Sequence, residues 1–317
     1  MQKLRKMAAI VAAALLLLGQ NHALVESAAV PTETPASPAF DPLKEAGYLP
    51  EGMEPYIHRD WENGSFLYVT QDFRVEITRY RRTEPTRLVW YIADIRSEKE
   101  VMGTVTFNEE RPGRTNGQPE AMALRSKAVY AQSGDFYSYR VANDRRTGVI
   151  IRDGEIIHSK THTKPLMALP NLDTAAFFPD GNMKVFESYE HTAKEYIEMG
   201  ATQVLSFGPI LLRDGAVNPL VNTNYTHQEP RSAIGIIGPG HYIGMLVEGR
   251  TDFSDGCGLK FLAETLYDIG CTDALNLDGG GTAAMLFMGE SVELGSGKGV
   301  PENARSIPDI LAIGTYN

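Results

Sequence analysis

The polar residues between two apolar segments near the C-terminus have the clearest chemical potential in this sequence. In ALNLDGGGTAAMLF, residues 274–287, Asn276 and Asp278 alternate with leucines, which predicts a β-strand with both polar side chains on one face. Three glycines follow the carboxylate, and glycine allows the positive φ angles of a tight turn. Successive N–H groups in such a turn can bind an anion. The pattern predicts a carboxylate beside an anion-binding backbone, with a hairpin that binds nothing as the alternative.

The alternation of apolar and polar residues predicts the elements that must position this turn. Early strands are expected in SFLYVTQDFRVEITRYRR and RLVWYIADI, and the Asp-Gly pairs in IIRDGEII, FFPDGNMKVF and ILLRDGAV predict hairpins. Helical spacing is found in PEAMALRSKA, HTAKEYIEMG and GLKFLAETLYDIG. We therefore expect a single α+β domain over residues 50–317, built on a mostly antiparallel or mixed sheet with a few packed helices.

The N-terminus has the pattern of a secretory signal peptide over residues 1–28. Lys3, Arg5 and Lys6 precede an apolar stretch, 7–19, that is too short to span a bilayer comfortably, and small residues follow. Residues 29–49 are rich in Pro, Ala and Thr, which predicts a flexible linker. The protein is expected to be secreted or extracytoplasmic, without a transmembrane segment after cleavage; an uncleaved N-terminal anchor is the alternative.

The net charge, the two cysteines and the histidines limit the ligands, disulfides and metal sites that we expect. The formal net charge of −10 argues against binding of nucleic acid through bulk charge. The two cysteines, Cys257 and Cys271, are separated by a predicted helix of roughly 20 Å, whereas a disulfide needs Cα atoms about 4.4–6.8 Å apart. We expect two buried free thiols. The histidines show no metal-ligand spacing, so neither a metal nor another cofactor is expected.

Six sequence blocks resemble the phosphodiester glycosidase family, in family order over about residues 128–313. The strongest is NLDGGGTAAMLF, which contains the family's Asn-Leu-Asp-Gly-Gly-Gly-Thr run intact. The others are AQSGDFYSY, FGPILLRDG, PRSAIGI, YIGMLVEGRTDFSDGCGLKF and RSIPDILAI. This chain departs from the usual pattern at Ser133, where the family commonly has Asn, and at Glu248, where it commonly has Asp. These two departures predict an altered substrate preference, with loss of activity as the alternative.

The resemblance implies hydrolysis of the bond between a sugar's anomeric carbon and a phosphodiester. The transition state of such a reaction resembles an oxocarbenium ion. A phosphate monoester leaves more readily as an anion than an alcohol does, so the site should depend less on a general acid and more on cations and N–H donors. Arginine suits that role because its planar guanidinium matches phosphate oxygens.

The resemblance also implies a set of site residues. Asp278 is expected nearest the anomeric carbon as nucleophile or base, with Asp135 and Glu248 as further catalytic carboxylates. Phe136 and Tyr137 are candidates for stacking on a sugar ring. The residues expected to bind the substrate and its phosphate are Arg231, Arg250, Arg305, Asn276, Ser133, Gly134, Gly279, Gly280, Gly281 and Thr282.

The expected function is that of an exported hydrolase that removes a sugar from a sugar-1-phosphodiester, on a cell-wall or extracellular glycopolymer. Two alternatives stay open. A non-catalytic carbohydrate- or wall-binding module would keep the arginines and aromatic residues without needing Asp278. A phosphodiesterase would break the bond on the other side of phosphorus. The sequence leaves open the sugar, the stereochemical outcome and the oligomeric state.

Overall fold

The computed structural model describes residues 47–143, 147–162, 164, 170–222, 226–294 and 305–317. The chain divides into two units, Met1–Ala39 and Phe40–Asn317, and every described element belongs to the second unit. The expected signal peptide and most of the expected linker lie outside the described residues, so these boundaries stay predictions. Within the described part, no helix is long and apolar enough to cross a membrane.

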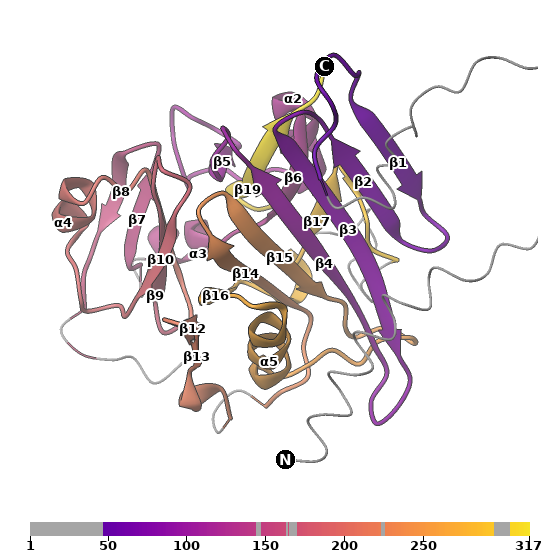
Figure 1. Ribbon diagram of the computed structural model, residues 1–317. Helices are drawn as coiled ribbons and strands as arrows, with labels where there is room; N and C mark the ends of the chain where they lie inside the picture. Colours follow the sequence, from indigo (N-terminus) through magenta and orange to yellow (C-terminus); the bar gives the residue numbers. More distant parts are fainter. Residues whose placement is uncertain (1–46, 144–146, 163, 165–169, 223–225, 295–304) are drawn as a thin grey trace, which may run out of the picture. The chain divides into compact units, whose positions relative to one another are not determined.

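The strands of the described part are paired antiparallel and form three sheets (Figure 1). The largest sheet contains, in spatial order, β1 (Tyr56–Asp60), β2 (Ser65–Val69), β3 (Phe73–Arg82), β4 (Leu88–Ser97), β15 (His241–Val247), β14 (Arg231–Gly238), β16 (Asp273–Leu277), β12 (Ile210–Arg213) and β13 (Ala216–Val217). The second contains β10 (Met183–Phe186), β9 (Asp173–Phe177), β11 (Gln203–Phe207), β7 (Val149–Arg152) and β8 (Glu155–Ser159). The third contains β18 (Glu290–Ser291), β17 (Met285–Phe287), β6 (Ala128–Ser133), β19 (Asp309–Thr315) and β5 (Gly103–Thr106).

Short helices accompany these sheets in the described residues. They are the α-helices α2 (Pro119–Ser126), α3 (Tyr137–Ala142), α4 (Ala193–Glu198) and α5 (Leu259–Ile269), and the 3₁₀ turns η1 (Pro219–Asn222) and η2 (Gly280–Thr282). The three helices expected from the sequence are α2, α4 and α5, and the three Asp-Gly turns join β7 to β8, β9 to β10 and β12 to β13. The expected α+β class is therefore confirmed, whereas α3 was not predicted.

The large sheet separates two apolar cores, and β16 contributes to both. Leu275 and Leu277 pack into the core shared with the other sheets, while Ala274 packs beneath α5 on the opposite face. Cys257 and Cys271 lie in this second core as buried free thiols, as expected. Figure 1 shows α5 against the β14–β16 part of the sheet. The alternation that predicted a strand therefore also predicted which side chains share a face.

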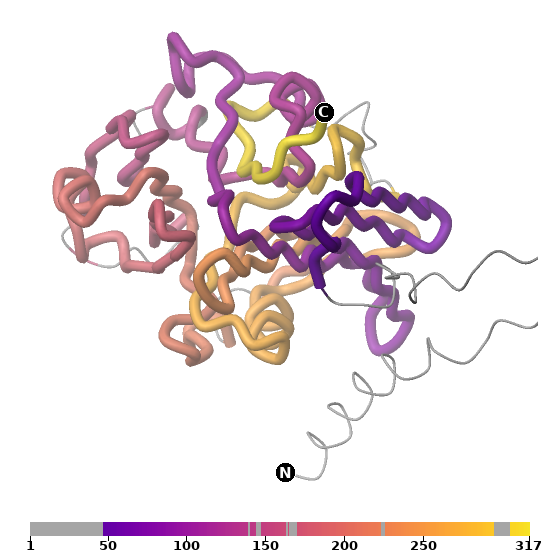
Figure 2. The backbone as a smooth tube through the Cα atoms, turned by 45° about the horizontal axis from the view of Figure 1, so that its top comes forward, coloured from indigo at the N-terminus to yellow at the C-terminus, as the bar shows by residue number. Residues whose placement is uncertain are grey.

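The third sheet joins segments that are far apart in the sequence. β19 pairs with β6 and β5, so the C-terminal strand lies beside strands that precede residue 134. Figure 2 shows this yellow strand next to the magenta segment. As a result, the C-terminal end of β6 and the residues before β19 approach the turn that follows β16.

Candidate functional site

The ends of three central strands, β14, β15 and β16, lie close together because neighbouring strands are antiparallel. β14 begins at Arg231, and its first residues pair with the last residues of both β15 and β16. Arg250, three residues beyond the end of β15, and Asp278, one residue beyond the end of β16, therefore lie near Arg231. The Asp278 N–H donates to Gly134 O over 3.2 Å, which adds the end of β6 to the same place.

A pocket of about 460 Å³ opens at this junction. Eight of the predicted site residues line it: Asp278, Gly279, Gly280, Gly281, Arg231, Arg250, Arg305 and the stacking candidate Phe136. The other lining residues are Arg140, Pro170, Phe207 and Glu229. Four arginines and two acidic residues therefore line the pocket, so the pocket is suited to an anionic ligand.

Asp278 is held at the base of this pocket by its own turn. Thr282 Oγ1 donates to Asp278 Oδ2 over 2.6 Å, and the turn between them is the short 3₁₀ element η2. Burial raises the pKa of Asp278 to about 6, although the hydrogen bond from Thr282 and the charges of Arg140 and Arg305 act in the opposite direction. A carboxylate with such a pKa can exchange a proton near neutral pH.

The three glycines serve different geometric needs. A Cβ on Gly279 would lie 2.4 Å from Pro230 O, so this position must stay bare for the turn to pack on β14. Gly280 has a φ of +62°, which disfavours other residues. A Cβ on Gly281 would meet only Arg305 Nη2, at 4.0 Å, on the pocket side. The glycines thus combine a close backbone approach with an open pocket floor.

The arginines are anchored to different degrees. Arg231 is buried, and it donates through Nε to Cys257 O over 3.1 Å and through Nη2 to His227 O over 3.0 Å. Arg250 forms an ion pair with Glu229, with Nη2 and Oε2 2.5 Å apart. Arg305 lies with its guanidinium carbon 5.8 Å from the centre of the Phe136 ring. Arg231 is thus fixed by backbone carbonyls, while Arg250 and Arg305 are exposed residues.

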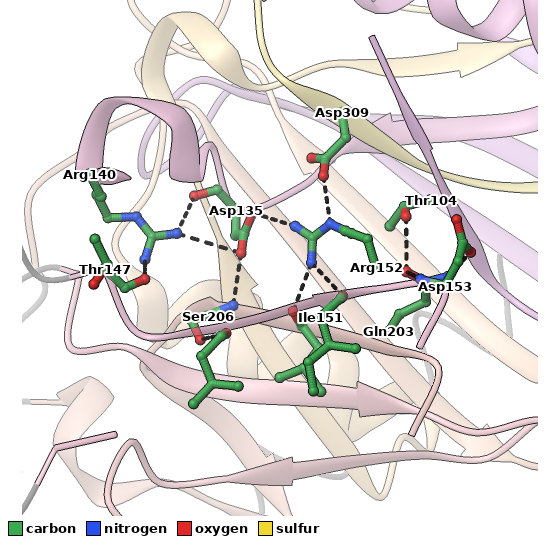
Figure 3. Close-up of polar contacts among 12 residues, drawn as sticks. Thr104, Asp135, Arg140, Thr147, Ile151, Arg152, Asp153, Gln203, Ser206 and Asp309 are labelled. Carbon is green, nitrogen blue, oxygen red and sulfur yellow. Dashed lines mark hydrogen bonds and ion pairs between the residues drawn. The ribbon is translucent and has the colours of Figure 1, made fainter. Parts of the chain in front are cut away.

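Asp135 is not at the pocket surface, and this changes its expected role. Its buried carboxylate accepts from Arg152 Nη2 and from Ser206 N, each over 2.9 Å, and Arg152 Nε also donates to Asp309 over 2.6 Å (Figure 3). Arg140 Nη2 donates to the Asp135 carbonyl oxygen over 3.0 Å. Because ion pairs and hydrogen bonds occupy the carboxylate, we infer that Asp135 positions Arg140 instead of contacting a sugar.

Glu248 is also placed outside the pocket lining. It is buried, and its Oε1 accepts from Tyr91 OH over 2.7 Å and from Leu294 N over 2.9 Å. Burial raises the pKa of this carboxyl group. The geometry gives no support to the predicted acid/base role, because the carboxyl group is enclosed between β4 and the segment after β18.

The remaining predicted residues support the pocket from behind. Asn276 Nδ2 donates to Gly208 O over 2.8 Å, so its buried side chain faces the turn before β12 and does not line the pocket. Ser133 Oγ accepts from Ala284 N over 3.2 Å. Tyr137, a predicted stacking residue, is buried with Arg152 over its ring at 4.9 Å. Only Phe136 of the aromatic pair reaches the pocket.

Sequence reasoning missed Arg140, Glu229, Phe207 and Pro170. Arg140 lies on α3, whose six residues, YSYRVA, are too few for a helical period to be visible. Glu229 directly precedes the Pro230–Arg231 pair of a recognised block, which was the one available signal for it. Over the described residues, no group of three or more His, Cys, Asp or Glu side chains is arranged to hold a metal ion. The expected independence from metals stays a prediction.

Comparison with known proteins agrees with this arrangement of sequence blocks around one pocket. The model of the phosphodiester glycosidase family matches residues 126–314, more than half of the chain. The chain belongs to the phosphodiester glycosidase family. One relative of this protein is the SPbeta prophage-derived uncharacterized protein YomE of Bacillus subtilis (strain 168). The two sequences are 27% identical over 184 residues. That match covers 57% of this chain but 28% of the relative, so the chain corresponds to less than a third of the relative's length.

Solved structures show the same fold. The catalytic domain of zebrafish N-acetylglucosamine-1-phosphodiester alpha-N-acetylglucosaminidase, auto-inhibited by its pro-peptide, is 20% identical with a TM-score of 0.59, over 86% of this chain and 87% of that chain. A hypothetical protein from Synechocystis is 11% identical with a TM-score of 0.53, over 84% of this chain and 64% of that chain. At these identities the likeness concerns the fold.

Proposed function

We propose that this protein hydrolyses the glycosidic bond of a sugar-1-phosphodiester. The observation that carries the proposal is the placement of the Asp278 carboxylate among the guanidinium groups of Arg140, Arg231, Arg250 and Arg305 in one pocket. A negatively charged phosphodiester matches the arginines, and a carboxylate beside them can face the anomeric carbon of the attached sugar. Family membership supports the same reaction class.

The arrangement favours a reaction in which the arginines stabilise the leaving group. As the bond between C1 and the phosphate oxygen breaks, its electron pair stays with the phosphate monoester, whose added negative charge the guanidinium groups balance. With Asp278 as base, the carboxylate takes a proton from water while the water oxygen bonds to C1. The products are the free sugar and the phosphate monoester. With Asp278 as nucleophile, a glycosyl ester forms first and water then releases the sugar.

This chemistry requires an ionised Asp278. Since burial raises its pKa to about 6, activity should rise as the pH increases through that value. We also propose that the protein acts outside the cytoplasmic membrane, on a cell-wall or extracellular glycopolymer. The support for this is the signal-like pattern of residues 1–28.

Hydrolysis in ¹⁸O-labelled water separates the candidate reactions. The probe is an α-N-acetylglucosamine 1-phosphodiester with a small alkyl group on the phosphate. Cleavage at C1 leaves the alkyl phosphate unlabelled. A phosphodiesterase would instead place the label on the phosphate, and it would release alkanol together with sugar 1-phosphate, or free sugar together with labelled alkyl phosphate. If the wild-type protein binds the probe but releases neither product, the binding-module alternative is favoured and the proposed activity is rejected.

A further inference from the structure

Three aromatic side chains form a continuous strip on the face of the large sheet that also carries α5. Tyr80 on β3 and Trp90 on β4 are direct cross-strand partners, and their rings stack at 5.4 Å with an interplanar angle of 15°. The ring of Phe261 on α5 meets Trp90 edge-on at 5.3 Å. We refer to Tyr80, Trp90 and Phe261 as the aromatic platform.

The aromatic platform is anchored in the core but open to solvent. Trp90 and Phe261 are half-buried and pack against the core beneath α5. Tyr80 is 43% exposed. Its partner Trp90 stacks against one face of the Tyr80 ring. The two rings thus form a parallel pair, and its outer face is a surface on which the C–H face of a pyranose ring can lie.

A hollow of about 290 Å³ begins at the end of the aromatic platform. Phe261 lines it, together with Arg82, whose guanidinium carbon lies 5.2 Å from the centre of that ring. Five further lining side chains can form hydrogen bonds with hydroxyl groups: Asn222, Thr226, Gln228, Lys260 and Glu264. Apolar rings beside amide, hydroxyl and charged groups match a polyhydroxylated ligand.

The hollow shares a wall with the arginine-lined pocket. Glu229 lines the pocket, its neighbour Gln228 lines the hollow, and a backbone bridge joins Glu229 to Cys257 through hydrogen bonds of 3.1 and 3.3 Å. Cys257 itself lines the hollow, and its carbonyl oxygen accepts from Arg231 in the pocket. One pair of bridged segments therefore separates the proposed phosphate site from the hollow.

We infer that the hollow and the aromatic platform bind saccharide units of a glycan chain attached to the phosphodiester. The inference rests on the proposed function, and it adds a second binding surface for the glycan part of the proposed substrate. A chain that leaves the phosphate at Arg231 crosses the Glu229–Cys257 bridge, places hydroxyl groups among the polar side chains of the hollow and lays a ring on the stacked Tyr80–Trp90 pair. The pocket then cleaves the sugar on the other side of the phosphate.

Trp90 supplies a direct readout, since the chain has two tryptophans and the other is Trp61. In a Trp61→Phe background, hexamers of N-acetylglucosamine and of glucose, both free of phosphate, are titrated against the folded protein while Trp90 emission is recorded. We expect at least one hexamer to change the emission in a saturable way. Tyr80→Ala should raise its Kd about tenfold, which corresponds to the loss of about 1.4 kcal/mol, while Tyr80→Phe should keep the tight binding.

Tyr267→Ala is the matched control, because Tyr267 is 52% exposed on α5 and does not belong to the aromatic platform. It should leave the Kd unchanged. The inference is overturned if neither hexamer affects Trp90, if Tyr80→Ala and Tyr267→Ala behave alike, or if Tyr80→Ala dissociates a dimer, which would show that a second copy covers the platform. Failure of the proposed function is distinct: the wild-type protein would then release no sugar from the short phosphodiester, whatever the hexamers do.

Discussion

Thr282 Oγ1 donates a hydrogen bond of 2.6 Å to Asp278 Oδ2, and the same hydroxyl lies 2.7 Å from Gly279 O. The two residues stand at either end of the glycine run, so the run closes into a turn that holds its own carboxylate. Thr282 is 2% exposed, which makes this contact part of the buried base of the pocket. The Thr282 hydroxyl therefore orients the proposed catalytic carboxylate and lowers its pKa against the effect of burial.

Thr282→Val should shift the pH dependence of sugar release. The hydrogen bond from Thr282 lowers the pKa of Asp278, which burial raises to about 6. Without it the pKa rises, so the acidic limb of the kcat/KM profile moves to higher pH and the rate at pH 6 falls, up to about tenfold. Thr282→Ser, which keeps the hydroxyl, should retain the wild-type limb. An unshifted limb in the valine variant would show that Asp278 is not the group that titrates.

Two alanine substitutions separate the folding role of the glycines from their role in binding. Gly279→Ala should lower the free energy of unfolding by about 1–3 kcal/mol, because the new Cβ would overlap Pro230 O. Gly281→Ala should leave stability within about 0.5 kcal/mol and raise KM for the short phosphodiester, since its Cβ enters the pocket beside Arg305. Denaturant unfolding and steady-state kinetics check both. Equal effects of the two variants on KM and stability would contradict this assignment.

Arg250 has a φ of +63°, a conformation that costs a non-glycine residue about 1–2 kcal/mol. Arg250→Gly should therefore not lower stability, although it should reduce kcat/KM about tenfold to a hundredfold by removing a guanidinium from the phosphate. Asp214→Gly is the control, because Asp214 also has a positive φ, +50°, in the exposed β12–β13 turn. It should preserve activity. Full activity of Arg250→Gly would mean that Arg250 serves only as a turn residue.

Arg152→Met tests the buried ion network of Figure 3. The substitution leaves the buried carboxylates of Asp135 and Asp309 without their shared cation, so it should lower the free energy of unfolding by about 3–5 kcal/mol. Arg213→Met removes a partly exposed ion pair with Glu190 and should cost less than about 1 kcal/mol. Chemical denaturation compares the two. A cost below about 1 kcal/mol for Arg152→Met would show that the network does not stabilise this fold.

The strands and hairpins were predictable because local patterns specify them. The Asp-Gly turns at Asp153 and Asp214 have positive φ at both residues, as the short hairpins require. Alternation in ALNL correctly assigned the leucines to one core. The short helix α3 was missed because its six residues pack by tertiary contacts and show no clear period of their own.

Site residues were predictable where one recognised sequence block contains both the residue and the turn or strand end that positions it. Asp278 and its glycines belong to such a block, and Arg231, Arg250 and Arg305 reach the pocket with it. The partners of Asp135 were not predictable, because Ser206 and Arg152 lie 71 and 17 residues away and meet it only through strand packing. Glu248 likewise meets Tyr91, 157 residues away. Such pairings depend on how the strands are ordered in the sheets. The spacing of residues in the sequence does not show that order.

The most direct test of the account is the rate of sugar release by Asp278→Asn from the short α-N-acetylglucosamine phosphodiester at about pH 7.5, where Asp278 should be ionised. We expect kcat to fall by about 10²–10⁴-fold, with the Kd for the phosphodiester unchanged. Stability should not fall, because the amide carries no charge into a site where burial raises the pKa of the carboxyl group to about 6. Release of sugar by Asp278→Asn within about tenfold of the wild-type rate would contradict the central claim.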